Sequence, residues 1–168
     1  MKALVRLAII PLVAGAWGAA HAGIACNVTY LTGTSIPFTQ YNPLASSTGS
    51  MQFRIDCTLA PPGGGSTTAT MNLSNGSSGT CLGPTGRSMI RQSAPPAATL
   101  GYNIFVGATS VEWGNAGCGT APTVTLKVNP GSLPNDTSTQ TLRGVIPANQ
   151  FVPDGTYSET LTLTIQFL

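Results

Sequence analysis

The last nine residues of the chain, 160–168, alternate strictly between polar and apolar side chains. Successive residues of a β-strand point to opposite faces, so this pattern predicts a strand with one face on a core and the other in water. The apolar face would carry Leu161, Leu163, Ile165 and Phe167. Because no turn or partner strand follows in the sequence, we expect this strand to leave an open edge. Open edges readily pair with other chains.

Similar alternation recurs along the sequence, whereas the 3.6-residue period of an amphipathic helix is missing. Short alternating stretches separated by turns rich in Gly, Pro and Asn are typical of an antiparallel β-sandwich or barrel. Clear alternation predicts strands over 50–57, 68–74, 100–106 and 123–128, and weaker alternation predicts strands over 26–31, 36–41, 111–113 and 141–146.

The first 22 residues have the layout of a secretory signal. Two basic residues and an apolar run over 7–16 precede Ala20-His21-Ala22, which fits a small-x-small cleavage site. We therefore expect cleavage before Gly23. A transmembrane anchor is the alternative interpretation, but the apolar run is shorter than the roughly 20 residues that a membrane span needs, and Pro11 interrupts it.

The remaining chain has the size of one domain. Removal of residues 1–22 from the 168 leaves 146, enough for one hydrophobic core and too few for two ordinary domains, so we interpret 23–168 as a single domain. It contains five basic and five acidic residues, and its net charge is close to zero. Without an excess of positive charge, nucleic acid and anionic membrane surfaces are poor partners. No later stretch is apolar enough to span a membrane.

Four cysteines, Cys26, Cys57, Cys81 and Cys118, lie beyond the predicted signal. An even number in an exported chain indicates two disulfides, for which three pairings are possible. We favour Cys26 with Cys57, because one lies in the first expected strand and the other closes a clearly alternating one; this leaves Cys81 with Cys118. A zinc site is the competing interpretation, but there is no Cys-x-x-Cys spacing and no histidine beyond residue 22.

The residue types needed for catalysis are scarce. His21 is the only histidine and belongs to the predicted signal, so a nucleophile activated by histidine cannot form in the processed chain. A glycosidase with two carboxylates remains conceivable. The acidic residues occur in turns and on polar strand faces, however, where solvated roles are usual. We therefore expect no enzyme, cofactor or metal, and we assign Trp113 to the core rather than to sugar stacking.

A series of short motifs runs through the sequence in a distinctive order: Cys26 in the first strand, 38–43, 49–57, Arg87-Ser88-Met89, 100–105, Trp113-Gly114 and 155–160. This order, with the terminal strand, resembles the spore coat protein U domain family, which includes subunits of archaic chaperone-usher pili. One departure is Thr39, where the family pattern would have glycine.

The resemblance implies an immunoglobulin-like sandwich that lacks its final strand. In such proteins a periplasmic chaperone lends a strand to the resulting groove, and a segment of a neighbouring pilin subunit later replaces it during assembly at an outer-membrane usher. By position, the groove floor would include Leu161, Leu163, Ile165 and Phe167. The implied location is the cell surface, reached through the periplasm, in a pilus or coat that serves adhesion or biofilm formation.

The segment available as a donor strand is short. Only residues 23–25 separate the predicted cleavage point from Cys26, and three extended residues reach roughly 10 Å. We therefore expect a strand acceptor that donates poorly and occupies the tip or another terminal position of a pilus. The alternatives are a secreted coat or matrix protein that does not polymerise, and a small tip adhesin that binds surface glycans.

Overall fold

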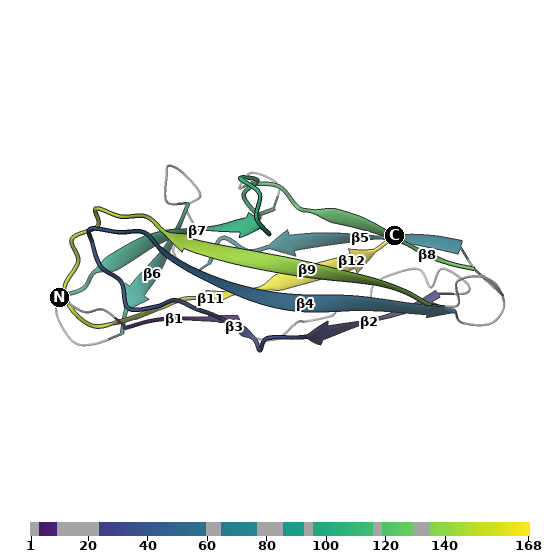
Figure 1. Cartoon of the computed structure of the whole chain (residues 1–168), viewed down its shortest axis with the longest axis horizontal. Helices are drawn as coiled ribbons and strands as arrows, with labels where there is room; N and C mark the ends of the chain where they lie inside the picture. The colour runs from purple at the N-terminus through teal and green to yellow at the C-terminus, as the bar shows by residue number, and fades with distance from the viewer. Residues whose placement is uncertain are drawn as a thin grey trace.

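The computed structural model describes residues 4–9, 24–59, 65–76, 86–92, 96–115, 119–129 and 135–168, with the backbone alone for 4–9. Every regular element in these ranges is a β-strand (Figure 1). The strands are β1 Leu4–Ile9, β2 Ile24–Tyr30, β3 Ser35–Pro37, β4 Ser47–Leu59, β5 Gly65–Leu73, β6 Arg87–Arg91, β7 Thr99–Val106, β8 Thr123–Val128, β9 Asn135–Ile146, β10 Thr156–Ser158, β11 Thr160–Leu161 and β12 Leu163–Phe167.

The strands form two sheets that together make a sandwich. The larger has the order β11-β1-β10-β6-β7-β9-β4-β2, with β3 also paired to β1, and the smaller has the order β12-β5-β8. Pairing is antiparallel except where β1 runs parallel to β10 and β11. In Figure 1, β4 crosses in front of β12, while β1 and β3 lie along one long edge of the molecule. The expected all-β, immunoglobulin-like architecture is confirmed.

The predicted alternation matches the buried positions closely. Met51, Phe53 and Ile55 in β4 are fully buried, as are Ala69, Met71 and Leu73 in β5. Trp113 is also fully buried, and its indole Nε1 donates a hydrogen bond to the backbone oxygen of Met71 at 3.1 Å. Trp113 therefore belongs to the core, as expected.

Three expected strands are shortened or divided in the structure. The one expected over 36–41 is limited to β3, because Pro37 has no N–H with which to continue a ladder. The one expected over 111–113 is reduced to isolated bridges at Glu112 and Trp113. The terminal strand is interrupted at Thr162, so that β11 belongs to the larger sheet and β12 to the smaller.

The predicted disulfide between Cys26 and Cys57 is confirmed. The two residues are direct partners in the antiparallel pairing of β2 with β4, and their Cα atoms lie 4.1 Å apart. This bond attaches the edge strand β2 to the body of the sandwich. The pairing expected for Cys81 and Cys118 lies outside the described residues.

Two paired glycines in β4 and β9 let β3 and the residue after it pack closely against these strands. Gly49 of β4 pairs with Gly144 of β9. A Cβ atom on Gly49 would lie 2.4 Å from the backbone oxygen of Pro37, and one on Gly144 would lie 2.4 Å from Cζ of Phe38. Side chains at these two positions would therefore push β3 and Phe38 away from β4 and β9.

We expect Gly144→Ala to destabilise the protein by about 1–3 kcal/mol, because the added methyl group overpacks the core against the buried ring of Phe38. Chemical denaturation monitored by circular dichroism measures the change. Gly65→Ala is the matched control, since a Cβ atom there would meet its nearest neighbour at 3.9 Å. Equal stability of the two variants would show that the close approach at Gly144 carries no cost.

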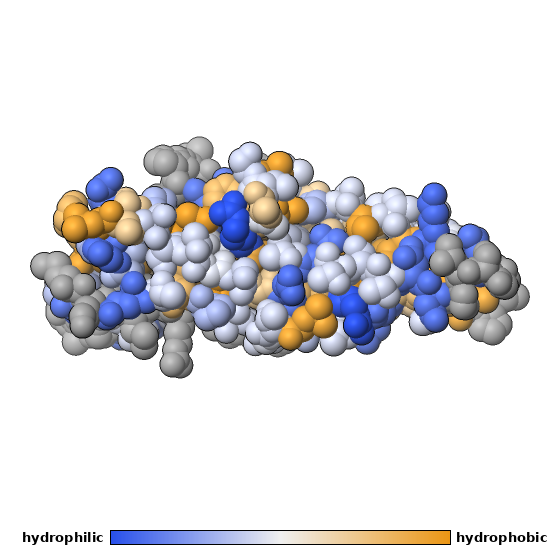
Figure 2. Space-filling view, viewed as in Figure 1, coloured by the Kyte–Doolittle hydropathy of each residue, from blue (hydrophilic) through white to orange (hydrophobic). Residues whose placement is uncertain are grey.

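The surface visible in Figure 2 is mostly polar, with apolar side chains in small separate groups. The most exposed large apolar residues are Leu44 and Phe151, at 80% and 76%. Their loops are joined by a hydrogen bond from the backbone N–H of Asn149 to the oxygen of Pro43. No helix in the described part of the chain is long and apolar enough to cross a membrane.

Candidate functional site

The segment Leu4–Ile9 fills a gap in the larger sheet. As β1 it lies between β10 and β11 on one side and β3 on the other. Among the described residues, β3 has no other strand partner, and the edges of β10 and β11 that face β1 have none either. Without β1 the sheet would therefore be open between residues 35–37 and residues 156–161. We call this position the acceptor gap.

The acceptor gap is bordered by buried core residues. In the pairing registers, Val5 lies opposite Tyr157, Leu7 opposite Ile36, and Ile9 opposite Leu161. Tyr157, Ile36 and Leu161 are all fully buried. An extended segment in the acceptor gap thus completes a ladder of backbone hydrogen bonds and lies beside three residues of the core.

The four residues predicted for the groove divide into two groups. Leu161 lies in β11 and borders the acceptor gap directly. Leu163, Ile165 and Phe167 lie in β12, opposite Leu73, Met71 and Ala69 of β5. Leu163 and Ile165 are buried and Phe167 is half-buried, so all four share the core-facing side of the terminal segment. Among the described residues the other edge of β12 has no ladder partner.

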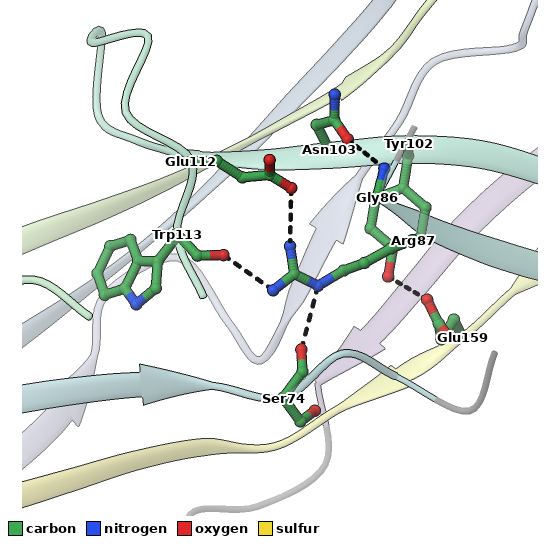
Figure 3. A network of polar contacts seen from close by, with 8 residues as sticks. All are labelled: Ser74, Gly86, Arg87, Tyr102, Asn103, Glu112, Trp113 and Glu159. Atoms are coloured by element: carbon green, nitrogen blue, oxygen red, sulfur yellow. Dashed lines mark hydrogen bonds and ion pairs between the residues drawn. The ribbon is translucent and has the colours of Figure 1, made fainter. Parts of the chain in front are cut away.

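The buried side chain of Arg87 connects several strands near the acceptor gap (Figure 3). Arg87, at the start of β6, donates hydrogen bonds to the backbone oxygens of Ser74 at 3.1 Å and Trp113 at 2.8 Å. Its guanidinium also lies 3.6 Å from a carboxylate oxygen of Glu112. Burial lowers the pKa of Arg87 from its ordinary value, and nearby acidic groups oppose that shift. The side chain joins the ends of β5 and β6 to the loop after β7.

A second buried contact fixes the terminal segment to β7. The Tyr102 hydroxyl donates a hydrogen bond to the Glu159 carboxylate, which lies between β10 and β11 (Figure 3). Gly76, with a positive φ of 77°, brings its backbone so close to this carboxylate that a Cβ atom would lie 2.0 Å from it. Burial raises the pKa of Tyr102, and the adjacent Glu159 adds to the rise.

This arrangement predicts a loss of stability at alkaline pH. A tyrosine whose folded pKa is raised contributes stability that is complete below its unfolded pKa, near 10, and is lost as the pH rises toward the folded pKa. Tyr102 should contribute a slope of up to about 1.4 kcal/mol per pH unit above pH 10. Denaturation at pH 8 to 11 measures the slope, which should shrink in Tyr102→Phe. An unchanged slope would contradict a role for this hydroxyl.

The interruption at Thr162 has a side-chain cause. Its backbone N–H donates to the hydroxyl oxygen of Ser74 at 2.9 Å, and its carbonyl accepts from the N–H of Ser74 at 2.9 Å. Ser74 thus contacts both the terminal segment and Arg87. The residues bordering the acceptor gap are consequently connected to the ends of β5, β6 and β7 by buried polar contacts.

The polar side chains beside the acceptor gap are already bonded to other groups of the protein. The described residues contain no cluster of His, Cys, Asp or Glu that could hold a metal ion. Arg87, Tyr102 and Glu159 are buried and bonded to other protein groups. Without β1, the acceptor gap would instead present unpaired backbone edges beside apolar side chains. Backbone hydrogen bonds with alternate apolar pockets are the means by which proteins bind an added strand.

The sequence profile of the Spore Coat Protein U domain matches residues 17–164. The chain belongs to the Spore Coat Protein U domain family. This family comprises structural proteins of coat and pilus type and is not known for catalysis. No curated protein matches the chain.

Two residues beside the acceptor gap of this Spore Coat Protein U domain were not predicted as site residues. Ile36 falls in a stretch with weak alternation, and Tyr157 occurs in the motif that precedes the terminal strand. Neither stood out as part of a clearly alternating stretch, because their strands β3 and β10 have three residues each. Arg87 and Glu159 were missed for a different reason: charged residues are expected on the surface.

Proposed function

We propose that this Spore Coat Protein U domain is a non-enzymatic, exported subunit of a surface pilus, which accepts a strand from another protein at the acceptor gap. Export takes it through the periplasm, where a chaperone first supplies the strand; an outer-membrane usher then exchanges the chaperone for a neighbouring subunit. The observation that carries the proposal is the pairing of β3, β10 and β11 with a single inserted segment.

The energetic basis is the cost of leaving the acceptor gap empty. Ile36, Tyr157 and Leu161 would each lose the strand that lies beside them, and burial of a large apolar side chain stabilises a protein by about 1.5–3 kcal/mol. The edges of β10 and β11 would also lose backbone hydrogen-bond partners, which water would have to replace. An incomplete sandwich of this kind is stabilised by a strand from outside, and that stabilisation explains the use of a chaperone.

The proposal includes a terminal position in the filament. Ile24 and Ala25 already belong to β2 and pair with Leu59 and Thr58 of β4, so they are used within the chain's own sheet. After cleavage before Gly23, no extension long enough to fill a neighbour's acceptor gap would remain. Such a subunit receives a strand but passes none on, and it would occupy the tip.

Substitutions on β12 test in cells whether export needs the apolar face of the terminal segment, which begins beside the acceptor gap at Leu161. We expect Ile165→Asp and Phe167→Asp each to reduce the periplasmic amount of the protein at least tenfold, because a carboxylate on the apolar face opposes completion of the core. Gln166→Asp, at the exposed position between them, is the matched control and should accumulate normally. Quantitative immunoblotting of periplasmic extracts measures the amounts. Normal export of both apolar-face variants would refute the role of this face.

A further inference from the structure

We infer that the leader segment Leu4–Ile9 is an intramolecular occupant of the acceptor gap, so that a chain retaining its leader is closed to strands from other proteins. This inference rests on the proposed function, because it concerns the same acceptor gap. It adds an autoinhibitory role for residues that the sequence assigns to export alone.

The first support is the position of β1 inside the sheet. It pairs on both sides, with Leu4 opposite Thr156 and Ala8 opposite Thr160 on one side and with Ala8 opposite Ser35 on the other. A strand paired on both edges uses the backbone groups that an incoming donor strand would need. While β1 is in place, a second strand cannot form the same ladders.

The second support is the match between the leader sequence and the register. Val5, Leu7 and Ile9 are the positions opposite the buried residues Tyr157, Ile36 and Leu161. The charged residue Arg6 falls instead opposite Pro37, which is exposed. A shift by one residue would bring Arg6 opposite a buried residue instead of opposite Pro37, and an unpaired charge beside the core is costly. The leader therefore has a favoured register in the acceptor gap.

The third support is the length of the connection. Residues 10–23 separate Ile9 from the start of β2 at Ile24, and fourteen residues can span up to roughly 46 Å. The insertion therefore needs no second chain. An intramolecular strand also has the advantage of a high effective concentration over a partner in solution. Removal of the leader would open the acceptor gap and make the chain competent for assembly.

Hydrogen exchange of the oxidised full-length chain tests the inference. The amides of residues 5–9 should exchange at least about 100-fold more slowly than in a free peptide of sequence Leu-Val-Arg-Leu-Ala-Ile. The full-length chain should also fail to bind that peptide carrying a fluorescent label, as measured by anisotropy. In Leu7→Pro, proline removes the N–H at the position opposite Ile36. This variant should lose the protection of residues 5–9 and bind the labelled peptide.

Lys2→Pro, outside β1, is the control and should behave like the unsubstituted chain. Slow exchange in β4 and β9 confirms that each variant is folded, and Leu7→Asp replaces Leu7→Pro if the proline variant fails this check. Fast exchange of residues 5–9 in a full-length chain that binds the peptide would overturn the inference and leave the proposed function standing. If the amides of residues 5–9 exchange fast in the full-length chain, and neither that chain nor any variant binds the peptide, the results refute both the inference and the proposed acceptance of a strand at the acceptor gap.

Discussion

Replacement of Arg87 by methionine should lower the free energy of unfolding by about 3–5 kcal/mol, because it leaves buried polar groups without their charged partner. The backbone oxygens of Ser74 and Trp113 would each lose a hydrogen bond in a region with little access to water. Glu112 would lose its cation. Methionine fills a similar volume, so loss of the polar contacts accounts for most of the effect.

Urea denaturation of the oxidised full-length chain, followed by fluorescence and circular dichroism, measures this change. Arg54→Met is the matched control. Arg54 forms a partly exposed ion pair with Asp56, and such pairs contribute about 0–1 kcal/mol. A decrease in the free energy of unfolding below about 1 kcal/mol for Arg87→Met would show that the contacts of Arg87 contribute no more than a surface ion pair.

Removal of the disulfide by the double substitution Cys26→Ser and Cys57→Ser should cost about 3–4 kcal/mol. The bond closes a loop between residues 31 apart in sequence, and the chain-entropy model gives this value for a loop of that length. The physical effect is on the unfolded chain, which gains freedom when the link is absent. In the folded protein, β2 keeps its ladder with β4 but loses its covalent attachment.

The same urea titration measures the disulfide's contribution. The double substitution should lower the denaturation midpoint while the far-ultraviolet circular dichroism of the native state stays unchanged. A matched control is Thr58→Ser, which keeps a hydroxyl at the neighbouring position in the ladder. An unchanged midpoint in the double variant would mean that the bond adds no stability, contrary to the chain-entropy expectation.

Much of the fold was predictable from period-two alternation. Residues 51, 53, 55 and 57 alternate in sequence and are all buried in β4, and the same holds for 69, 71 and 73 in β5. The pairing of Cys26 with Cys57 followed from their places in two of the expected strands. In these elements the apolar side chains are the buried ones, so the sequence pattern predicts directly which face of the strand lies on the core.

Elements in which burial and polarity disagree were less predictable. β6 escaped detection because its first buried position is Arg87. The N-terminal half of β9 is polar throughout, yet it pairs with β4 as far as Asn135 opposite Thr58. Backbone hydrogen bonds between strands and buried polar contacts hold these segments in place. Such contacts produce no alternation of apolar residues in the sequence, so the strands could not be predicted from it.

The candidate site was predictable in part for a related reason. Leu161, Leu163, Ile165 and Phe167 were recognisable as one apolar face. The opposite border of the acceptor gap, β3, depends on a contact distant in sequence, where Gly49 and Gly144 admit Pro37 and Phe38. The insertion of Leu4–Ile9 was not predicted, because an apolar leader gives the same sequence signal whether or not it pairs with the domain.

The most direct test of strand acceptance is hydrogen exchange of the chain beginning at Gly23, refolded with and without the peptide of sequence Leu-Val-Arg-Leu-Ala-Ile. The peptide should slow exchange at Ser35, Ile36 and residues 156–161, where β1 pairs, and should have a much smaller effect between β4 and β9. The same peptide with aspartate at the positions of Val5, Leu7 and Ile9 should have no effect. Exchange at residues 156–161 that is unchanged by saturating peptide would contradict the acceptor gap.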